Sequence, residues 1–250
     1  GFLIYTDLSQ VELRVASFLS GDPKMAFEFS QGIDRHWHRA LLIYNDKPCT
    51  THGATLDKSC ISCNTARQVG KTVNFLLIYL GGASQLQTTL RKEMGKLIPM
   101  WTCQEIVRNT HEEYPHYINW ARSLCKEASR EGVISDPILG TSRKVSLSRA
   151  SNWMDKSTLA NFPVQLASAC VMLGIQVPLS THLIQSGLRS RIILNTYDSL
   201  ILEGPADELS QARDIHDKFF LTKSEYHARL ETYYERPLVL EWETKVTEFS

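Results

Sequence analysis

The sequence predicts an α+β fold in which strands near both ends of the chain flank a long helical middle. Apolar runs at 2–6, 192–194 and 200–202 have the length and composition of buried strands. The stretch 67–80 instead repeats its apolar residues at helical spacing. With 250 residues, the chain is long enough for one large domain or two modest ones with a sizeable core.

Composition narrows the class of protein. Hydrophobic residues make up 43% of the chain and charged residues 22%, as in ordinary soluble globular proteins, and no low-complexity segment occurs. The net charge of zero argues against a nonspecific polycation. Nucleic-acid binding stays open because it needs only a local patch, here Arg67, Lys71, Arg91, Lys92 and Lys96.

We expect an intracellular, cytoplasmic protein that does not cross a membrane. No run of about 18 apolar residues is present, and the chain opens on an apolar segment followed by an acid rather than on a signal peptide. Six cysteines in a chain of this length do not make a disulfide scaffold, and Cys103, Cys125 and Cys170 stand singly in helix-like segments. Such buried thiols indicate a reducing compartment.

The first predicted strand, 2–6, leads directly into Asp7. An acid at a strand end is well placed to bind a metal ion, although a capping role explains the same spacing equally well. The next segment, 8–16, has helical spacing and holds Gln10 and Glu12 near the strand end. These side chains form the first candidate site.

Four candidate metal ligands follow in the segment 49–63. Cys49 and His52 form one pair and Cys60 and Cys63 another, each with a two-residue gap that lets both members reach one tetrahedral ion. We therefore expect a structural zinc ion here. The alternative is a short loop of reduced thiols.

The helix expected over 67–80 has an unusual outer face. Its apolar residues form one arc that would face a core, while two cations and then two aromatic residues follow on the other side, namely Arg67, Lys71, Phe75 and Tyr79. That face could hold a polyphosphate at one end and stack a planar ring at the other. A solvated amphipathic helix explains the apolar arc but not the large aromatic residues opposite it.

Up to about Arg130 the chain is expected to be mainly helical, with one helix beginning near Asp34 and a break at Tyr114–Pro115. A hairpin is then expected over 132–144, with apolar runs at 133–134 and 138–139 and a turn through 140–142 to Arg143.

A further helix is expected to begin near Asn161, with Pro163 in its first turn. Asn161 and Gln165 share one face of it, where their amides could meet bases or sugars, although exposed amides are usually only solvated.

The C-terminal part of the chain is expected to alternate strands and helices. The runs 192–194 and 200–202 predict a buried hairpin that presents Asp198 at its tip. Helices are expected over 206–223 and from Glu225. In the final predicted strand, one face is shared by Leu238, Leu240 and Trp242.

The arrangement of charges points to a type of chemistry. Acids at two strand ends and a helix presenting cations and then aromatics, without a nucleophile or base motif, suggest phosphoryl or nucleotidyl transfer on a pair of magnesium ions. Carboxylates suit magnesium because this ion prefers hard oxygen ligands.

These segments resemble family A DNA polymerases, the bacterial polymerase I type. The segment 7–14 is similar to the family's first polymerase motif, 67–81 to its second, on the fingers helix, and 197–199 falls where the third belongs. Segments that are similar to further parts of the family, in the same order, are 34–36, 132–144 and 161–165. The resemblance implies a template-directed DNA polymerase with a right-hand palm, formed by an antiparallel sheet with helices, and mainly helical fingers.

The resemblance also implies a role for each matching residue. Asp7, Asp198 and the carbonyl of Leu8 would hold two magnesium ions. The incoming deoxynucleotide would contact Gln10, Glu12, His36, Arg67, Lys71, Phe75 and Tyr79. The primer–template DNA would contact Arg143, Asn161, Gln165 and Tyr197.

Some of these roles are more specific. Lys71 would donate a proton to the leaving pyrophosphate, and Glu12 would be the steric gate that excludes a ribose 2′-hydroxyl. Phe75 would stack near the sugar and base, and Tyr79 would guard the templating position.

The resemblance divides the chain into regions. Residues 1–28 would belong to the palm, 29–130 to the fingers, with the zinc-binding insertion at 49–63, and 131–250 again to the palm. The thumb and the proofreading exonuclease are expected on an upstream segment or on a second chain. Without a thumb, primer extension should be weak and distributive.

Two departures from the family pattern matter. The third motif usually reads His-Asp-Glu, whereas here Tyr197 and Ser199 flank Asp198, so the accessory acid is missing. The insertion at 49–63 is not a general feature of the family.

Two other functions stay open. One is a single-subunit RNA polymerase of related fold, against which Glu12 argues. The other is a noncatalytic DNA-binding or replisome subunit, against which the retained Asp7, Asp198 and Lys71 argue. The resemblance also leaves the source open between a cell and a virus or phage, for which the location would be the host cytoplasm.

Overall fold

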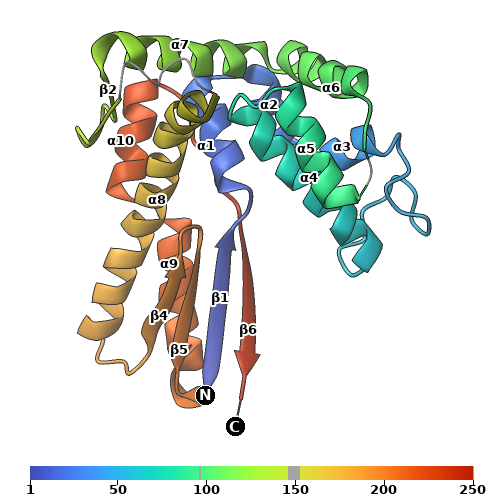
Figure 1. Ribbon diagram of the computed structural model, residues 1–250. Helices are drawn as coiled ribbons and strands as arrows, with labels where there is room; N and C mark the ends of the chain where they lie inside the picture. The colour runs from blue at the N-terminus through green and yellow to red at the C-terminus, as the bar shows by residue number, and fades with distance from the viewer. Residues whose placement is uncertain (96, 146–152, 250) are drawn as a thin grey trace. The chain divides into compact units, whose positions relative to one another are not determined.

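The computed structural model describes residues 1–95, 97–145 and 153–249, so Lys96 of the predicted basic patch lies outside the described residues. The fold is mixed α+β and mostly helical, with an antiparallel sheet, which confirms the predicted class (Figure 1). The chain forms two compact units. The first, here called the sheet unit, comprises 1–19, 135–141 and 162–250; the second, the helical unit, comprises 20–134 and 142–161.

The sheet unit is built around one four-stranded antiparallel sheet of order β4-β5-β1-β6. Its strands are β1 (Phe2–Leu8), β4 (Arg191–Thr196), β5 (Ser199–Gly204) and β6 (Trp242–Glu248). The first strand thus lies between strands from the far end of the chain, and Figure 1 shows the two termini side by side. In β1 the even-numbered residues are buried, which leaves Tyr5 and Asp7 on the more accessible face.

A hydrogen-bond network fixes β1 against the helix behind it. Thr6 Oγ1 lies 2.7 Å from His216 Nε2 and 3.1 Å from Thr244 Oγ1. The His216 ring, fully buried, stacks on Phe220 with 4.5 Å between ring centroids. The strand that carries Asp7 is therefore held by side chains from both a helix and a neighbouring strand.

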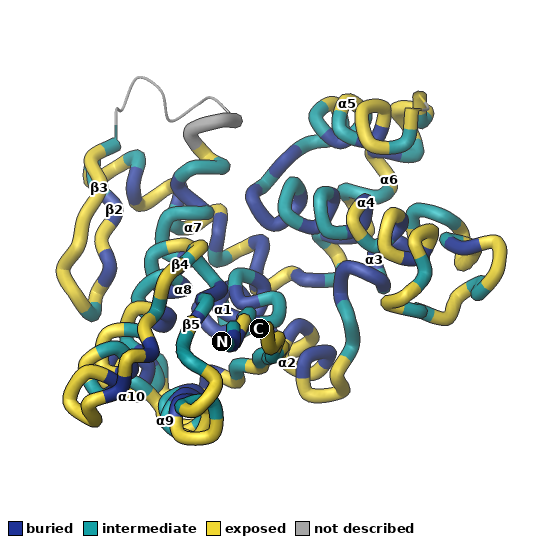
Figure 2. The backbone as a smooth tube through the Cα atoms, turned by 90° about the horizontal axis from the view of Figure 1, so that it is seen from below, coloured by how far each residue is buried: buried dark blue, intermediate teal, exposed yellow. Residues whose placement is uncertain are grey.

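The predicted buried hairpin exists, but only one of its strands is buried. Ser199, Leu200 and Leu202 of β5 are buried, whereas β4 is an edge strand with Ile193 and Leu194 exposed (Figure 2). An apolar run alone does not distinguish a central strand from an edge strand, which is why this part of the prediction was wrong.

The sheet unit also contains α1 (Val11–Ser20), the short η1 (Ala206–Glu208), α9 (Leu209–Leu221) and α10 (Glu225–Tyr234). The long α8 (Trp153–Gln185) belongs to it from Phe162 onward. Helix α1 begins only at Val11, because Leu8 continues β1 and Gln10 has a left-handed backbone with φ of 52°.

The predicted start of the helix around Pro163 needs correction. Pro163 lies well inside α8 rather than in its first turn, and the neighbouring Leu159, Ala160 and Val164 are buried. Their packing offsets the hydrogen bond that proline cannot donate.

The final strand begins at Trp242, so Leu238 and Leu240 precede it. Residue 238 is instead tied to α10, since its N–H donates to Glu231 Oε1 (2.8 Å) and its carbonyl lies 2.9 Å from His227 Nε2. Side chains of α10 thus make the backbone hydrogen bonds that a neighbouring strand would have made.

The hairpin expected after the helical region is present in a different register. Its strands are β2 (Val133–Ser135) and β3 (Ser142–Lys144), and Ile138 and Leu139 lie in the connection between them. Both of these residues donate their N–H groups to Asp136 Oδ2, at 3.1 and 2.6 Å, so a side chain shapes the turn.

The helical unit contains α2 (Pro23–Ser30), α3 (Arg35–Ile43), α4 (Ile61–Ile78), α5 (Ala83–Met94), α6 (Met100–Glu113) and α7 (Pro115–Glu131). The break at Tyr114 is confirmed, and α4 follows the predicted helix, with Val69, Val73 and Leu77 buried against α5 and α6. Helix α2 was missed, although Asp22 caps it and Pro23 stands at its first position.

One stretch of α8, Lys156–Gln185, is long and apolar enough to cross a membrane by length and composition, and 39% of its most apolar window is buried. The sequence analysis looked for an unbroken apolar run and did not identify this stretch, because polar residues interrupt it. The core helix of a globular domain has the same length and composition, so this one helix is weak evidence for a membrane.

Candidate active site

The structure brings the two predicted metal-binding acids to one end of the sheet. Asp7 pairs with Ser199 across β1 and β5, and Asp198 occupies the tight turn just before Ser199. The Leu8 N–H donates to the Asp198 carbonyl at 2.8 Å, which ties the turn to β1. Antiparallel pairing thus joins carboxylates that lie far apart in the sequence.

Both carboxylates act on the same hydroxyl. Tyr5 Oη lies 3.4 Å from Asp7 Oδ1, and burial together with the charges of Asp7 and Asp198 raises the pKa of Tyr5. Carboxylate and carbonyl oxygens are the donors that magnesium prefers. The set of Asp7, Asp198 and the Leu8 carbonyl therefore fits magnesium by its chemistry.

Two residues near these acids have left-handed backbones that only glycine adopts freely. They are Gln10, with φ of 52°, and Tyr197, with φ of 66°. The Tyr197 N–H donates to Asn195 Oδ1 at 3.0 Å, and the next N–H, of Asp198, donates to the Thr196 carbonyl at 2.7 Å. Local hydrogen bonds therefore hold the turn in a conformation of the kind that often occurs at functional sites.

Tyr197 also links several predicted site residues. Its hydroxyl lies 3.2 Å from the Gln165 carbonyl oxygen, to which it can donate, and beside the Glu12 carboxylate and the Ser168 hydroxyl. Burial and then the Glu12 charge raise the pKa of Tyr197 well above its ordinary value. Residues predicted to contact nucleotide (Glu12) and DNA (Gln165, Tyr197) are therefore neighbours, and Ser168 joins them without having been predicted.

The remaining residues predicted to bind DNA are placed individually. Arg143 is exposed on β3. Asn161 lies in α8, and its buried Oδ1 has no hydrogen-bond partner among the described residues.

In the helical unit, Asp34 joins the start of α3 to α4. Its Oδ1 caps α3 by accepting the N–H groups of His36 and Trp37, both at 3.0 Å, and its Oδ2 accepts from Arg67 Nε at 2.7 Å. Burial alone would raise the pKa of Asp34, but the Trp37 N–H and Arg67 lower it below its ordinary value. Arg67 is thus positioned by an ionised carboxylate.

His36 is buried and electrically neutral. Burial and the charge of Arg67 lower its pKa to about 3. Arg39 Nε donates to Asn74 Oδ1 at 3.0 Å, and because arginine cannot accept, the Asn74 amide nitrogen faces His36 Nδ1 at 3.3 Å. This arrangement leaves the ring proton on Nε2, so His36 can offer an N–H group but no charge.

The predicted face of α4 is formed. Lys71 Nζ lies 5.8 Å from the centroid of the Phe75 ring, and the Phe75 and Tyr79 rings stack with 6.1 Å between centroids. Phe75 also contacts His36, with 5.8 Å between ring centroids. Lys71 and Phe75 therefore follow one another along the helix as the spacing predicts, whereas Tyr79 stands just beyond the end of α4 and is buried.

The backbones of α3 and α4 lie close together at Gly70. A Cβ atom added there would lie 2.0 Å from the His36 carbonyl oxygen and 2.9 Å from the Ala40 nitrogen. Only glycine allows this contact between backbones.

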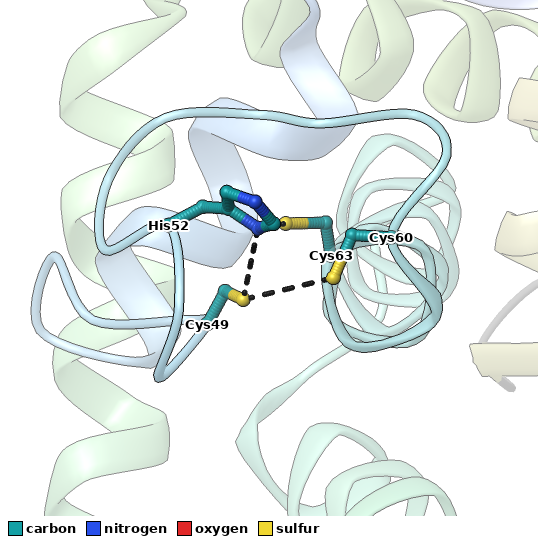
Figure 3. A group of neighbouring side chains, drawn as sticks. All are labelled: Cys49, His52, Cys60 and Cys63. Atoms are coloured by element: carbon teal, nitrogen blue, oxygen red, sulfur yellow. Dashed lines mark hydrogen bonds between the residues drawn. The ribbon is translucent and has the colours of Figure 1, made fainter.

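The four predicted zinc ligands also converge, and they are referred to below as the Cys3His cluster. Cys49 and His52 come from the loop after α3, and Cys60 and Cys63 from the start of α4 (Figure 3). Their ligand atoms all lie within 4.8 Å of one another. A cluster of three cysteines and one histidine is a donor set of structural zinc sites.

Sequence reasoning missed the residues that orient the predicted ones. Asn74 positions His36, Ser168 contacts Tyr197, and Asp57 Oδ2 lies 3.4 Å from His52 Nε2. Only Asp57 had a local signal, namely a carboxylate between two pairs of metal ligands. The other contacts join distant parts of the chain.

Comparison with known proteins places this site in a family. The model of "DNA polymerase family A" matches residues 1–236. Among curated relatives, DNA polymerase I of Chloroflexus aurantiacus is 28% identical over 212 residues, which are 84% of this chain and 21% of that protein. Thermostable DNA polymerase I of Thermus thermophilus is 28% identical over 213 residues, 82% of this chain and 23% of that protein.

A solved structure has a similar fold. The POL domain of Pol1 from M. smegmatis, in complex with DNA primer-template and dNTP, covers 98% of this chain with a TM-score of 0.70 at 20% identity. The chain in turn covers 39% of that structure and about a fifth of the curated relatives. Because the family model matches nearly the whole sequence, the chain belongs to the family A DNA polymerases.

Proposed function

We propose that this chain is the palm and fingers module of a template-directed DNA polymerase, which adds deoxynucleotides to a primer 3′ end. The observation that carries the proposal is the meeting of Asp7 and Asp198 at one end of the sheet in a chain of this family. The sheet unit would be the palm and the helical unit the fingers.

The proposed chemistry assigns a task to each group. Asp7, Asp198 and the Leu8 carbonyl would hold two magnesium ions, which when bound activate the primer hydroxyl and neutralise the developing phosphate charge. Arg67 and Lys71 would bind the triphosphate as cations, and Lys71 would also protonate the leaving pyrophosphate. His36, being neutral, would donate its Nε2–H.

Specificity and partners follow from the same residues. Glu12 would exclude ribonucleotides, with Gln10, Phe75 and Tyr79 completing the nucleotide contacts. Primer–template DNA would contact Arg143, Asn161, Gln165 and Tyr197. The similar POL domain was solved with both of these ligands, which supports DNA and dNTP as partners here.

A structural zinc ion would occupy the Cys3His cluster, supported by its donor set and convergence. All six cysteines are free thiols, which supports the assignment to a reducing, intracellular compartment. The thumb and exonuclease would be supplied by an upstream segment or a second chain.

A primer-extension assay with magnesium tests the polymerase proposal. Wild type should extend the primer with dNTPs, and Asp198→Ala should lose activity by at least about 10²-fold because a metal ligand is gone. Asp214→Ala, an exposed acid on α9, is the matched control and should keep full activity.

Three results would contradict the proposal. Equal activity of wild type and Asp198→Ala would show that Asp198 does not have the assigned metal-binding role. Preference for ribonucleotides would favour an RNA polymerase. DNA binding without extension by wild type would favour a noncatalytic subunit.

A further inference from the structure

We infer that a zinc ion bound by the Cys3His cluster, in which Asp57 orients His52, holds the first turn of α4 against α3. Zinc occupancy would therefore set the affinity for deoxynucleoside triphosphate. The zinc site stands on its own geometry. The effect on nucleotide affinity rests on the proposed function of Arg67 and Lys71.

The separations within the cluster match a tetrahedral zinc ion. With Zn–S of about 2.3 Å and Zn–N of about 2.05 Å, tetrahedral ligands lie about 3.8 Å apart for S···S and about 3.6 Å for S···N. Cys49 Sγ lies 3.9 Å from Cys60 Sγ, and His52 Nδ1 lies 3.6 Å from the sulfurs of Cys49 and Cys63. A disulfide would need about 2.05 Å, so these thiols are spaced for a shared ion.

Asp57 completes the site from outside. Its Oδ2 lies 3.4 Å from His52 Nε2, on the side of the ring opposite the thiols. Its Oδ1 is fixed by the N–H and the hydroxyl of Ser59, at 2.8 and 2.6 Å. A carboxylate at Nε2 holds the ring proton there and leaves the Nδ1 lone pair directed at the metal position.

The cluster is packed into the junction of α3 and α4. Cys49 and Cys63 belong to one buried group with Trp37 and Ala40 of α3 and Ala66 of α4. Trp37 Nε1 also donates to the Ala54 carbonyl of the loop at 2.9 Å. The loop, the first turn of α4 and α3 therefore form one packed body with the cluster inside it.

The same body carries the cation that would meet the triphosphate. Cys63 lies in the first turn of α4 and Arg67 one turn further along, on the helix that Asp34 ties to α3. Cys60, the N-cap residue of α4, makes no side-chain hydrogen bond to cap the helix, so bound metal would be what holds that end. Loss of zinc should loosen the first turn and displace Arg67 from Asp34.

The first experiment measures zinc directly. Protein purified without chelator should contain one zinc per chain by mass spectrometry, and Cys60→Ser should contain none. Cys170→Ser, outside the cluster, should retain the metal. Absence of zinc from wild type, or equal zinc in wild type and Cys60→Ser, would overturn the inference.

Asp57 is tested by an isosteric change. Asp57→Asn keeps an oxygen for Ser59 but places an amide where His52 Nε2–H needs an acceptor, so zinc affinity by chelator competition should fall about 10–100-fold. Asp46→Asn, in the same loop, is the matched control and should bind zinc as wild type does. Unchanged zinc affinity in Asp57→Asn would show that Asp57 does not support zinc binding through His52.

The last experiment tests the coupling on the full chain. Zinc removal should speed amide hydrogen exchange in 61–67 while β1 and β5 keep their protection, and should weaken binding of a fluorescent dNTP about tenfold. Faster exchange with unchanged dNTP affinity would overturn the coupling but keep the zinc site. Normal zinc with no dNTP binding would overturn the proposed function instead.

Discussion

Tyr197 has a backbone conformation that tyrosine rarely adopts, and its contacts show what that conformation achieves. The left-handed turn lets its hydroxyl meet Glu12, Ser168 and the Gln165 carbonyl while the next residue, Asp198, stays tied to β1. The Glu12 carboxylate is therefore not a freely moving acid. It lies beside the Tyr197 hydroxyl, near the end of the sheet where we propose that Asp7 and Asp198 bind magnesium.

This contact leads to a prediction about sugar selection. Glu12→Ala should raise ribonucleotide incorporation relative to deoxynucleotide incorporation by about tenfold or more, because space for a 2′-hydroxyl is opened. Tyr197→Phe, which removes the hydroxyl beside Glu12, should give a smaller change in the same direction. The measurement is the ratio of kcat/KM for dATP and ATP.

The control for both variants is Glu127→Ala, which removes an exposed acid of α7. Unchanged sugar selectivity in Glu12→Ala would refute the gate.

At the scale of single elements, the spacing of apolar residues predicted the structure correctly where one face of a helix packs against a core. Val69, Val73 and Leu77 of the predicted apolar arc of α4 are buried, and Lys71 and Phe75 lie beside each other as predicted, but Tyr79 is buried. The prediction was wrong where the local structure depends on side chains that are distant in the sequence. Leu238 is tied to α10 rather than to a strand, and Pro163 is tolerated inside α8 because its neighbours are buried.

The site residues could be predicted from the sequence within the same limits. Asp7, Asp198 and the Cys3His cluster could be found because each stands out within a short segment of sequence. Asn74 and Ser168 could not, because their importance arises only when a second element packs against them.

The close approach of α3 and α4 leads to a prediction about how a substitution of Gly70 in α4 changes the stability of the protein. Gly70→Ala should lower the free energy of unfolding by about 1–3 kcal/mol, because the added methyl group meets the His36 backbone. This is the net loss, after the gain of about 1 kcal/mol that alanine brings to a helix interior has been subtracted from a larger steric cost. Chemical denaturation measures it.

Gln68→Ala, on the exposed side of the same helix, is the control and should change stability by less than about 0.5 kcal/mol. A Gly70→Ala variant as stable as this control would show that the helices can separate without cost.

At the scale of the whole molecule, stability should depend on pH through buried charges. His36 has a folded pKa of about 3 against 6.5 for the free side chain, so its contribution is complete above pH 6.5 and lost as pH falls towards 3. For Glu113, burial opposes ionisation, but His38, Arg39 and Lys24 lower the pKa to about 2. Its contribution is lost below about pH 4.5.

Both contributions act in the same direction, so the protein should lose stability on acidification. Between pH 6.5 and 5, His36→Gln should reduce the slope of unfolding free energy against pH by at most about 1.4 kcal/mol per unit. The exposed His116→Gln is the control and should leave the slope near that of wild type. An identical slope in His36→Gln would show that His36 titrates normally.

The position of β1 in the sheet has a consequence for how the protein is made. Among the described residues β1 pairs with β5 and β6, so during synthesis it must wait for partners that are made much later than β1 itself. Most of the helical unit, 20–134, is continuous and can fold in the meantime. A nascent chain would thus contain folded α4, which we propose binds the triphosphate, before Asp7 and Asp198 meet, and the proposed site would be assembled only after β5 has been synthesised.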